Sequence, residues 1–196
     1  MTTIDDEKKR LRKRMRALRL VVDQKEGPDA ARAVIGHLLA ATERLGITAG
    51  SVVAGYWPIV TELDIRPLLA RLDERGVVCA LPVVVASDAP LSFRRWRPLD
   101  PLDVGLRGTS QPVVYAPEVV PEVVLVPLLA FDGEGYRLGQ GGGFYDRTLA
   151  ALRACGPLTA VGVGFAAQMV EKVPRDGDDQ PLDYILTEQA LLRAGA

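Results

Sequence analysis

Short runs of β-branched and other apolar residues alternate with helical patterns along most of this 196-residue chain, and this alternation is the strongest constraint on its fold. The run over residues 123–126 is apolar at every position, which is typical of a strand buried on both faces. Strands that alternate with helices form parallel sheets with helices on both faces. The pattern therefore predicts an α/β fold with a mostly parallel sheet in a three-layer, Rossmann-like arrangement, with ligands at the carboxyl ends of the strands.

The expected elements follow one another without a linker, so we predict one domain over residues 1–196. Two helices open the chain: an amphipathic one with an apolar stripe at Leu11, Met15, Leu18 and Val22, and a second over residues 29–45 that ends at Gly46. Further strands are expected at residues 51–56, 77–85, 91–96, 123–126 and 159–165. Further helices are expected at residues 64–74 and from residue 144 onward. A surface loop is expected over residues 98–117, and an irregular tail at the end of the chain.

The composition excludes several classes of protein. No apolar run reaches the roughly 18 residues that a membrane helix needs, and the basic N-terminus lacks the apolar core of a leader peptide. We therefore expect a cytoplasmic protein without a membrane partner. A monomer is also expected, although no sequence pattern bears on the oligomeric state. Cys79 and Cys155 are expected to be buried, reduced thiols. With one histidine, His37, expected as a packed or boundary helix residue, no zinc site can be assembled, so any metal is expected to be a hard cation such as Mg²⁺ on carboxylates.

A glycine loop lies between an expected strand and an expected helix, with four glycines in five positions: Gly139, Gly141, Gly142 and Gly143. Each ordered glycine costs about 0.5–1 kcal/mol relative to alanine. Without Cβ atoms, successive N–H groups can converge on an anion at the start of the next helix. A flexible turn is the alternative, but the flanking Arg137 and Arg147 favour phosphate binding. The loop is not a Walker A motif, because no Gly-Lys-Ser/Thr follows it.

Charged residues gather in two other places. Eight of the 24 lysine and arginine residues lie between Lys8 and Arg19, although the formal net charge is only −1. Such a helix could bind a nucleic acid or an anionic membrane. No aromatic residues are interleaved with the cations, as a base-stacking surface requires, so no nucleic-acid partner is expected. The second group is acidic and could be either a solvated turn or a metal site: Asp176, Asp178, Asp179 and Asp183.

These residues resemble the 5-formyltetrahydrofolate cyclo-ligases, also called methenyltetrahydrofolate synthetases, over nearly the whole chain. The most specific part of the resemblance runs from Val126 to Arg147 and includes the glycine loop. A second part is Lys8-x-x-Leu11-Arg12, which is similar to the nucleotide-binding Lys-x-x-Leu-Arg of the family. Some positions depart from the family pattern: Gln140 stands where many members have Tyr, Gln111 where Glu is common, and Asp178 where a His often precedes Asp179.

The resemblance implies ATP- and Mg²⁺-dependent closure of 5-formyltetrahydrofolate to 5,10-methenyltetrahydrofolate through a phosphorylated formyl group. The residues that it implies for ATP are Lys8, Arg12, Arg137, Gly139, Gln140, Gly141, Gly142, Gly143, Phe144 and Tyr145. Those implied for folate are Trp57, Glu62, Gln140 and Tyr145, and those for Mg²⁺ are Asp146 and Asp179. Simpler roles compete: Asp146 could be only a first-turn helix acid, and Trp57 could be core. The functional alternative is a relative that binds nucleotide or folate without turnover.

Overall fold

The computed structural model describes residues 3–106 and 108–195, and its centre is a seven-stranded sheet with the order β11-β10-β9-β6-β1-β2-β3. An antiparallel strand forms each edge: β3 (Ser92–Arg95) beside β2, and β11 (Leu191–Arg193) beside β10. The strands between these edges are parallel: β2 (Val78–Val83), β1 (Val52–Ala54), β6 (Val123–Pro127), β9 (Thr159–Val163) and β10 (Tyr184–Leu186). The predicted α/β fold with a mostly parallel sheet is confirmed.

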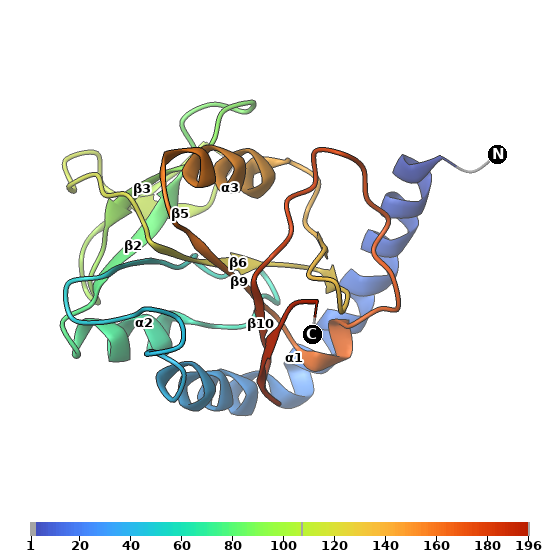
Figure 1. Ribbon diagram of the computed structural model, residues 1–196, viewed down its shortest axis with the longest axis horizontal. Coiled ribbons are helices and arrows are strands. Elements are labelled where there is room, and N and C mark those ends of the chain that lie inside the picture. Colours follow the sequence, from blue (N-terminus) through green and yellow to red (C-terminus); the bar gives the residue numbers. More distant parts are fainter. Residues whose placement is uncertain (1–2, 107, 196) are drawn as a thin grey trace.

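Helices cover both faces of this sheet (Figure 1). α1 (Ile4–Leu39) and α2 (Arg66–Asp73) lie on one face, and α3 (Phe144–Cys155) lies on the other. In β6, Val123 and Leu125 pack into the core beneath α1 and α2, whereas Val124 and Val126 pack with Leu149 of α3. Because successive side chains of a strand point to opposite faces, a strand that is apolar throughout needs cover on both.

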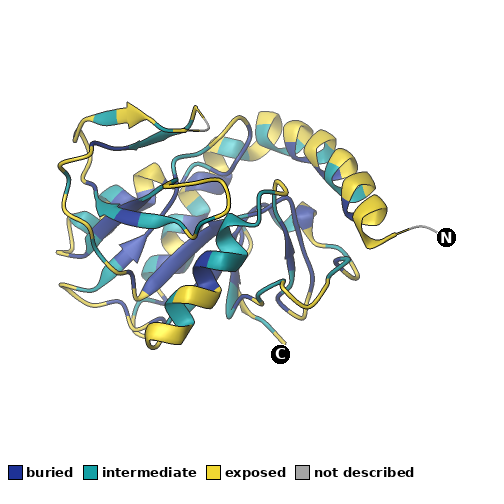
Figure 2. Cartoon of the chain, turned by 90° about the horizontal axis from the view of Figure 1, so that it is seen from above, coloured by how far each residue is buried: buried dark blue, intermediate teal, exposed yellow. Residues whose placement is uncertain are grey.

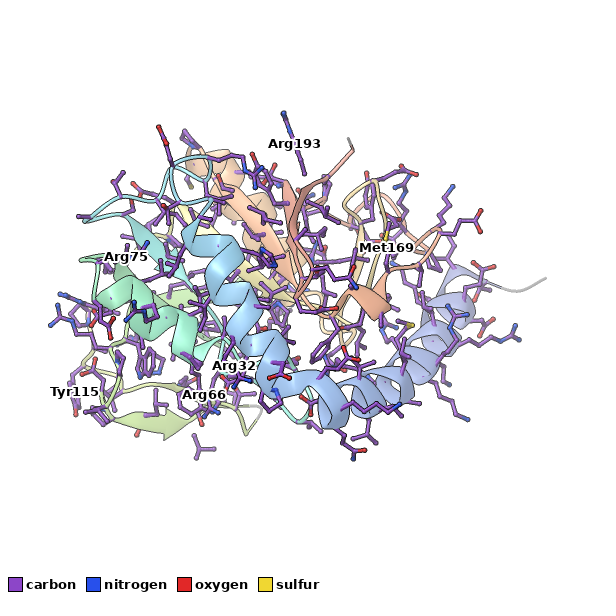
Figure 3. The ribbon with its side chains drawn as sticks, turned by 90° about the horizontal axis from the view of Figure 1, so that it is seen from below. Arg32, Arg66, Arg75, Tyr115, Met169 and Arg193 are labelled. Carbon is purple, nitrogen blue, oxygen red and sulfur yellow. The ribbon has the colours of Figure 1, made fainter. Side chains whose placement is uncertain are left out.

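α1 corrects a prediction, because the two expected N-terminal helices form a single 36-residue helix with Pro28 inside it. An internal proline costs about 3 kcal/mol, but Ala30, Val34 and Leu38 beyond it are buried in the core. Their burial offsets that cost. The helix changes direction along its length (Figures 1 and 3), as helices do at an internal proline. It ends at Leu39, earlier than predicted, and turns lead from there to Gly46.

Both ends of α1 match their local sequence. At the start, the Thr3 hydroxyl accepts a hydrogen bond from the Asp6 N–H at 3.2 Å, and the Asp6 carboxylate accepts one from the Thr3 N–H, which forms a capping box. Near the end, His37 is half-buried and Nε2 lies 3.1 Å from the Glu188 carbonyl oxygen, as expected for a boundary residue. The outward side of α1 is exposed, whereas the central strands of the sheet are largely buried (Figure 2).

Several shorter elements were not predicted. The expected loop over residues 98–117 contains the hairpin β4 (Leu102–Val104) and β5 (Ser110–Pro112), and a second hairpin, β7 (Ala130–Phe131) and β8 (Arg137–Leu138), precedes the glycine loop. The tail contains a 3₁₀ helix, η1 (Ala166–Gln168), as well as β10 and β11.

The cysteine prediction was half wrong. Cys79 is buried in β2, but Cys155 is exposed because it occupies the last, outward-facing turn of α3. Within the described ranges, no helix is long and apolar enough to cross a membrane.

The strand order places the ligand site. From β1 the chain passes to β2 on one side, whereas β6 pairs with β1 on the other side. The order therefore reverses between β1 and β6, and in sheets of this kind ligands bind outside the carboxyl ends of the strands at such a reversal. The segments that follow these two strands begin at Gly55 and Leu128.

Candidate functional site

A cleft of about 980 Å³ opens at the carboxyl ends of β1 and β6. Its walls come from the start of α1, the segment after β1, the glycine loop with the first turn of α3, and residues 176–180. Every residue that the sequence singled out for ATP, folate or Mg²⁺ lines this cleft. The structure thus brings together residues separated by up to 171 positions, while their individual roles stay predictions.

The glycine loop has the backbone shape of an anion cradle. Gly141 and Gly143 have φ values of 102° and 65°, which side chains rarely adopt, and Gly143 is the N-cap of α3. A Cβ atom would lie 2.8 Å from the Phe144 ring at Gly142 and 2.6 Å from an Arg147 nitrogen at Gly143. The first N–H groups of a helix have no partner within the helix and attract negative charge. The loop therefore fits a phosphate group.

Two cations from one face of α1 reach this loop and the segment opposite it. Lys8 Nζ donates to Asp179 Oδ2 at 2.7 Å and to Asp176 Oδ2 at 2.8 Å. One turn later, Arg12 Nε donates to the Gly139 carbonyl oxygen at 3.0 Å, and its terminal nitrogens bond to none of the described residues. Burial opposes the charge on Lys8, but hydrogen bonds with Asp176 and Asp179 outweigh it, so the Lys8 pKa is raised. Lys8 and Arg12 both line the cleft, and cations of this kind form strong hydrogen bonds with phosphate oxygens.

Arg137, which is buried, and Asp146, which is half-buried in the first turn of α3, form an ion pair beside the glycine loop. Arg137 Nη2 donates to Asp146 Oδ1 at 2.8 Å, and the Gln180 N–H donates to the same oxygen at 3.0 Å. Arg137 is only 7% exposed, and burial lowers its pKa, although the charges of Asp146 and Asp179 oppose the shift. Asp146 also lies in the first turn of α3, where the helix dipole favours an acid.

The carboxylates fit Mg²⁺ in combination with phosphates. Asp146 and Asp179 both line the cleft and both act on the charge of Arg137. Each has one oxygen in the hydrogen bonds above, and the other accepts no hydrogen bond from a described residue. No group of three or more acidic, histidine or cysteine residues in the described ranges could hold a metal. Mg²⁺ is commonly held by one or two carboxylates plus phosphate oxygens and water, so these two residues fit that use.

The opposite end of the cleft is less charged. Trp57 is half-buried there, with the Arg66 guanidinium 4.9 Å from the ring centre and the Trp96 ring edge-on at 6.0 Å. Glu62 is 7% exposed and accepts a hydrogen bond from the Ile59 N–H at 3.1 Å. Burial raises the Glu62 pKa, and the nearby Arg19 charge and the Ile59 and Gln140 hydrogen bonds oppose the shift. An aromatic ring beside a buried acceptor suits a flat heterocycle that carries N–H groups.

Two arginines of α1 were missed by the sequence interpretation. Arg16 donates to Gln140 Oε1 at 2.8 and 3.1 Å, which gives the glycine loop another contact with α1. Arg19 is buried between α1 and the sheet and bonds to Thr61 Oγ1 and the Leu128 carbonyl oxygen. A signal for Arg19 existed, because it is four residues after Met15 and so lies on the inward stripe.

The comparisons with known proteins decide the family. The model of the 5-formyltetrahydrofolate cyclo-ligase family matches residues 4–188. This chain belongs to that family. Cyclo-ligases of Escherichia coli K12 and Mycolicibacterium smegmatis are 32% and 34% identical to it, over 90% and 71% of this chain and 96% and 74% of theirs. The NMR structure of Aquifex aeolicus 5,10-methenyltetrahydrofolate synthetase has a TM-score of 0.79 and 33% identity, and the match covers 96% of this chain and 93% of that one.

Two other carboxylates serve the scaffold: Asp132, in the most specific part of the resemblance, and Asp183, in the acidic group near the C-terminus. Asp132 is buried and accepts hydrogen bonds from the N–H groups of Glu134, Tyr136 and Val173, which fixes the β7–β8 hairpin to the tail. Asp183 accepts from the Ala160 N–H at 2.7 Å and so joins β9 to the start of β10. These carboxylates shape the cleft of this cyclo-ligase family member from outside it.

The three departures from the usual cyclo-ligase pattern differ in their consequences. Gln140 is held by Arg16 at the mouth of the cleft, and Asp178 also lines the cleft. Gln111 lies in β5 on the outlying hairpin, where its side-chain oxygen is buried without a hydrogen-bond partner in the described structure.

Proposed function

We propose that this chain is an ATP- and Mg²⁺-dependent 5-formyltetrahydrofolate cyclo-ligase, which converts 5-formyltetrahydrofolate to 5,10-methenyltetrahydrofolate with release of ADP and phosphate. The observation that carries the proposal is that one cleft contains both ends of the expected site. The glycine loop and its cations form the end suited to phosphate, and Trp57 with the buried acceptor Glu62 forms the end suited to folate. Family membership and the relatives named above support the same reaction.

The proposed reaction has two steps. The formyl oxygen on N5 attacks the γ-phosphorus of ATP, and the bond to the bridging oxygen of ADP breaks. N10 then attacks the activated formyl carbon and loses its proton, and phosphate leaves with the former formyl oxygen. The product is the cationic methenyl bridge between N5 and N10. Phosphoryl transfer needs mainly alignment and charge neutralisation, so no residue has to form a covalent bond with the substrate.

The residues divide this work. Lys8, Arg12 and Arg137 neutralise the polyphosphate, and the glycine-loop N–H groups hold it in line with the formyl oxygen. Asp146 and Asp179 would hold Mg²⁺. When bound, this ion would neutralise negative charge on the γ-phosphoryl group during its transfer.

At the other end, Glu62 accepts hydrogen bonds from the pterin N–H groups, and Trp57, Tyr145 and Gln140 fix the ring and the formyl group. We further propose that one chain acts alone in the cytoplasm, since a single chain supplies every wall of the cleft. Light scattering of the purified protein tests the monomer.

The experiment is a mixing assay. Purified protein, ATP, Mg²⁺ and 5-formyltetrahydrofolate are expected to give the methenyl absorbance, and omission of ATP is expected to abolish it. Protein that binds both substrates in calorimetry yet gives no absorbance change would establish the alternative, a binding relative without turnover.

A further inference from the structure

We infer that Arg19 is a positioning residue that holds Glu62 in place and ionised at the folate end of the cleft. The inference rests on the proposed function in one respect, the use of Glu62 as the folate acceptor. Arg19 does not line the cleft. It would act only through the residues that it touches.

Arg19 contacts residues of two different segments at once. Its side chain is 4% exposed. Nε donates to Thr61 Oγ1 at 3.0 Å, and one terminal nitrogen donates to the Leu128 carbonyl oxygen at 3.2 Å. That same nitrogen lies 3.7 Å from Glu62 Oε1. Arg19 therefore joins α1 to the segments that follow β1 and β6, the two strands between which the sheet order reverses.

The surroundings of Glu62 leave its charge dependent on Arg19. Besides Arg19, the groups that act on the carboxylate are the Ile59 N–H and the Gln140 side chain of the glycine loop, which form hydrogen bonds with it. The hydroxyls of Tyr56 and Tyr145 are also close enough for the Glu62 charge to raise their pKa. None of these is a cation. Within the described residues, Arg19 is thus the positive group that offsets the burial of Glu62.

This arrangement has a consequence for pH. Burial raises the Glu62 pKa, and the Arg19 charge holds the rise back. An opposite charge a few ångströms from a carboxylate lowers its pKa by about 1–3 units. Loss of Arg19 is therefore expected to move the acid limit of folate binding upward, because Glu62 would take up a proton at a higher pH and could no longer accept two pterin hydrogen bonds.

The test is calorimetric binding of 5-formyltetrahydrofolate, without ATP, as a function of pH. For Arg19→Gln we expect the acid midpoint to rise by about one pH unit and the affinity at neutral pH to fall about tenfold, while ATP affinity is unchanged. Arg19→Lys is expected to restore the midpoint, because it keeps the charge, but only part of the affinity, because an ammonium cannot repeat the fork of bonds. Arg32→Gln is the matched control, because Arg32 is an exposed arginine farther along α1 (Figure 3) and does not line the cleft. This variant should behave as wild type.

A double-mutant cycle separates positioning from scaffold support. In a Glu62→Gln background, Arg19→Gln is expected to cause no further pH shift. If Arg19→Gln left the acid midpoint unmoved, or lost folate and ATP affinity equally, the inference would be overturned. Arg19 would then have a structural role only. If Arg19→Gln does not fold, Arg19→Lys decides alone, since wild-type folate affinity in that variant would also overturn it. Wild-type protein that binds folate but makes no methenyl product refutes only the proposed function.

Discussion

Lys8 and Asp179 form a salt bridge at the cleft, with Nζ 2.7 Å from Oδ2, although 171 positions separate them in the chain. The pair brings the start of α1 beside the segment over residues 174–181 (Figure 1). In the proposed function, Lys8 binds phosphate and Asp179 binds Mg²⁺. In the structure the two opposite charges neutralise each other. Binding of ATP and Mg²⁺ would replace this contact with one from Lys8 to phosphate and one from Asp179 to Mg²⁺.

The contact predicts a pH-dependent contribution to stability. The Lys8 pKa is raised above its usual 10.5, so its stabilisation is fully present below that pH and is lost as the pH rises through the raised value. The hydrogen bond from Lys8 lowers the Asp176 pKa below its usual 3.8. The stabilisation that Asp176 contributes is therefore lost only as the pH falls through this lowered pKa.

Lys8→Met is therefore expected to reduce the unfolding free energy by roughly 1 kcal/mol at neutral pH. Below pH 3.8 the difference from wild type should shrink. Chemical denaturation at several pH values measures it, and a difference that grows in acid would contradict this account of the contact.

The first catalytic prediction compares cations on two faces of α1. Lys8→Ala and Arg12→Ala are expected to lower kcat/KM for ATP about tenfold or more, because each loses about 1.4 kcal/mol of phosphate stabilisation. Lys13 and Arg14 are exposed on the same helix and do not line the cleft, so Lys13→Ala and Arg14→Ala are the controls. Steady-state kinetics at two salt concentrations would reveal a general anion surface instead, if all four variants lost the same activity with a steep salt dependence.

A second prediction concerns the metal. Asp146→Asn and Asp179→Asn are expected to raise the Mg²⁺ concentration for half-maximal activity about tenfold, because an amide is a poorer ligand for a hard cation. Asp183→Asn is the comparison, since that carboxylate bonds to the scaffold outside the cleft. A loss of thermal stability without a changed Mg²⁺ requirement would assign Asp146 and Asp179 to structure alone.

The glycine loop offers a matched pair of substitutions. Gly143→Ala must place a Cβ atom at φ 65° and 2.6 Å from an Arg147 nitrogen, so we expect ATP affinity to fall about tenfold as the cradle distorts. At Gly139 a Cβ atom meets nothing within 4 Å, and φ is not in the left-handed region. Gly139→Ala should therefore bind ATP almost normally, and calorimetry compares the two. Equal affinities would argue against the loop as the phosphate site.

The sequence predicted what depends on local patterns. Residues 123–126 indicated the buried strand, the glycine cluster indicated a loop before a helix, and the alternation of strands and helices indicated the parallel sheet. Each of these signals arises from a few neighbouring residues. The residues proposed for the site could also be named from the sequence, because Lys8, Glu62 and Asp146 stand at positions that resemble those of a known family.

What the sequence did not predict depends on contacts between distant segments. We predicted two N-terminal helices, but the apolar residues beyond Pro28 are buried against the sheet and keep α1 continuous. The spacing from Met15 indicated that Arg19 faces inward, but its role could not be predicted, since its partners, Thr61 and Leu128, are 42 and 109 positions away. The edge strand β11 has only three residues, Leu191–Arg193, which is too short a run for a sequence pattern to indicate a strand.

The most direct test of the proposed chemistry follows the formyl oxygen. We would supply 5-formyltetrahydrofolate labelled with ¹⁸O in the formyl group, together with ATP and Mg²⁺ in unlabelled water, and analyse the released phosphate by mass spectrometry. Phosphoryl transfer to the formyl oxygen predicts one ¹⁸O atom in the phosphate for each methenyl group formed. Phosphate without the label would contradict the phosphorylated formyl intermediate, because the oxygen would then have left by another route.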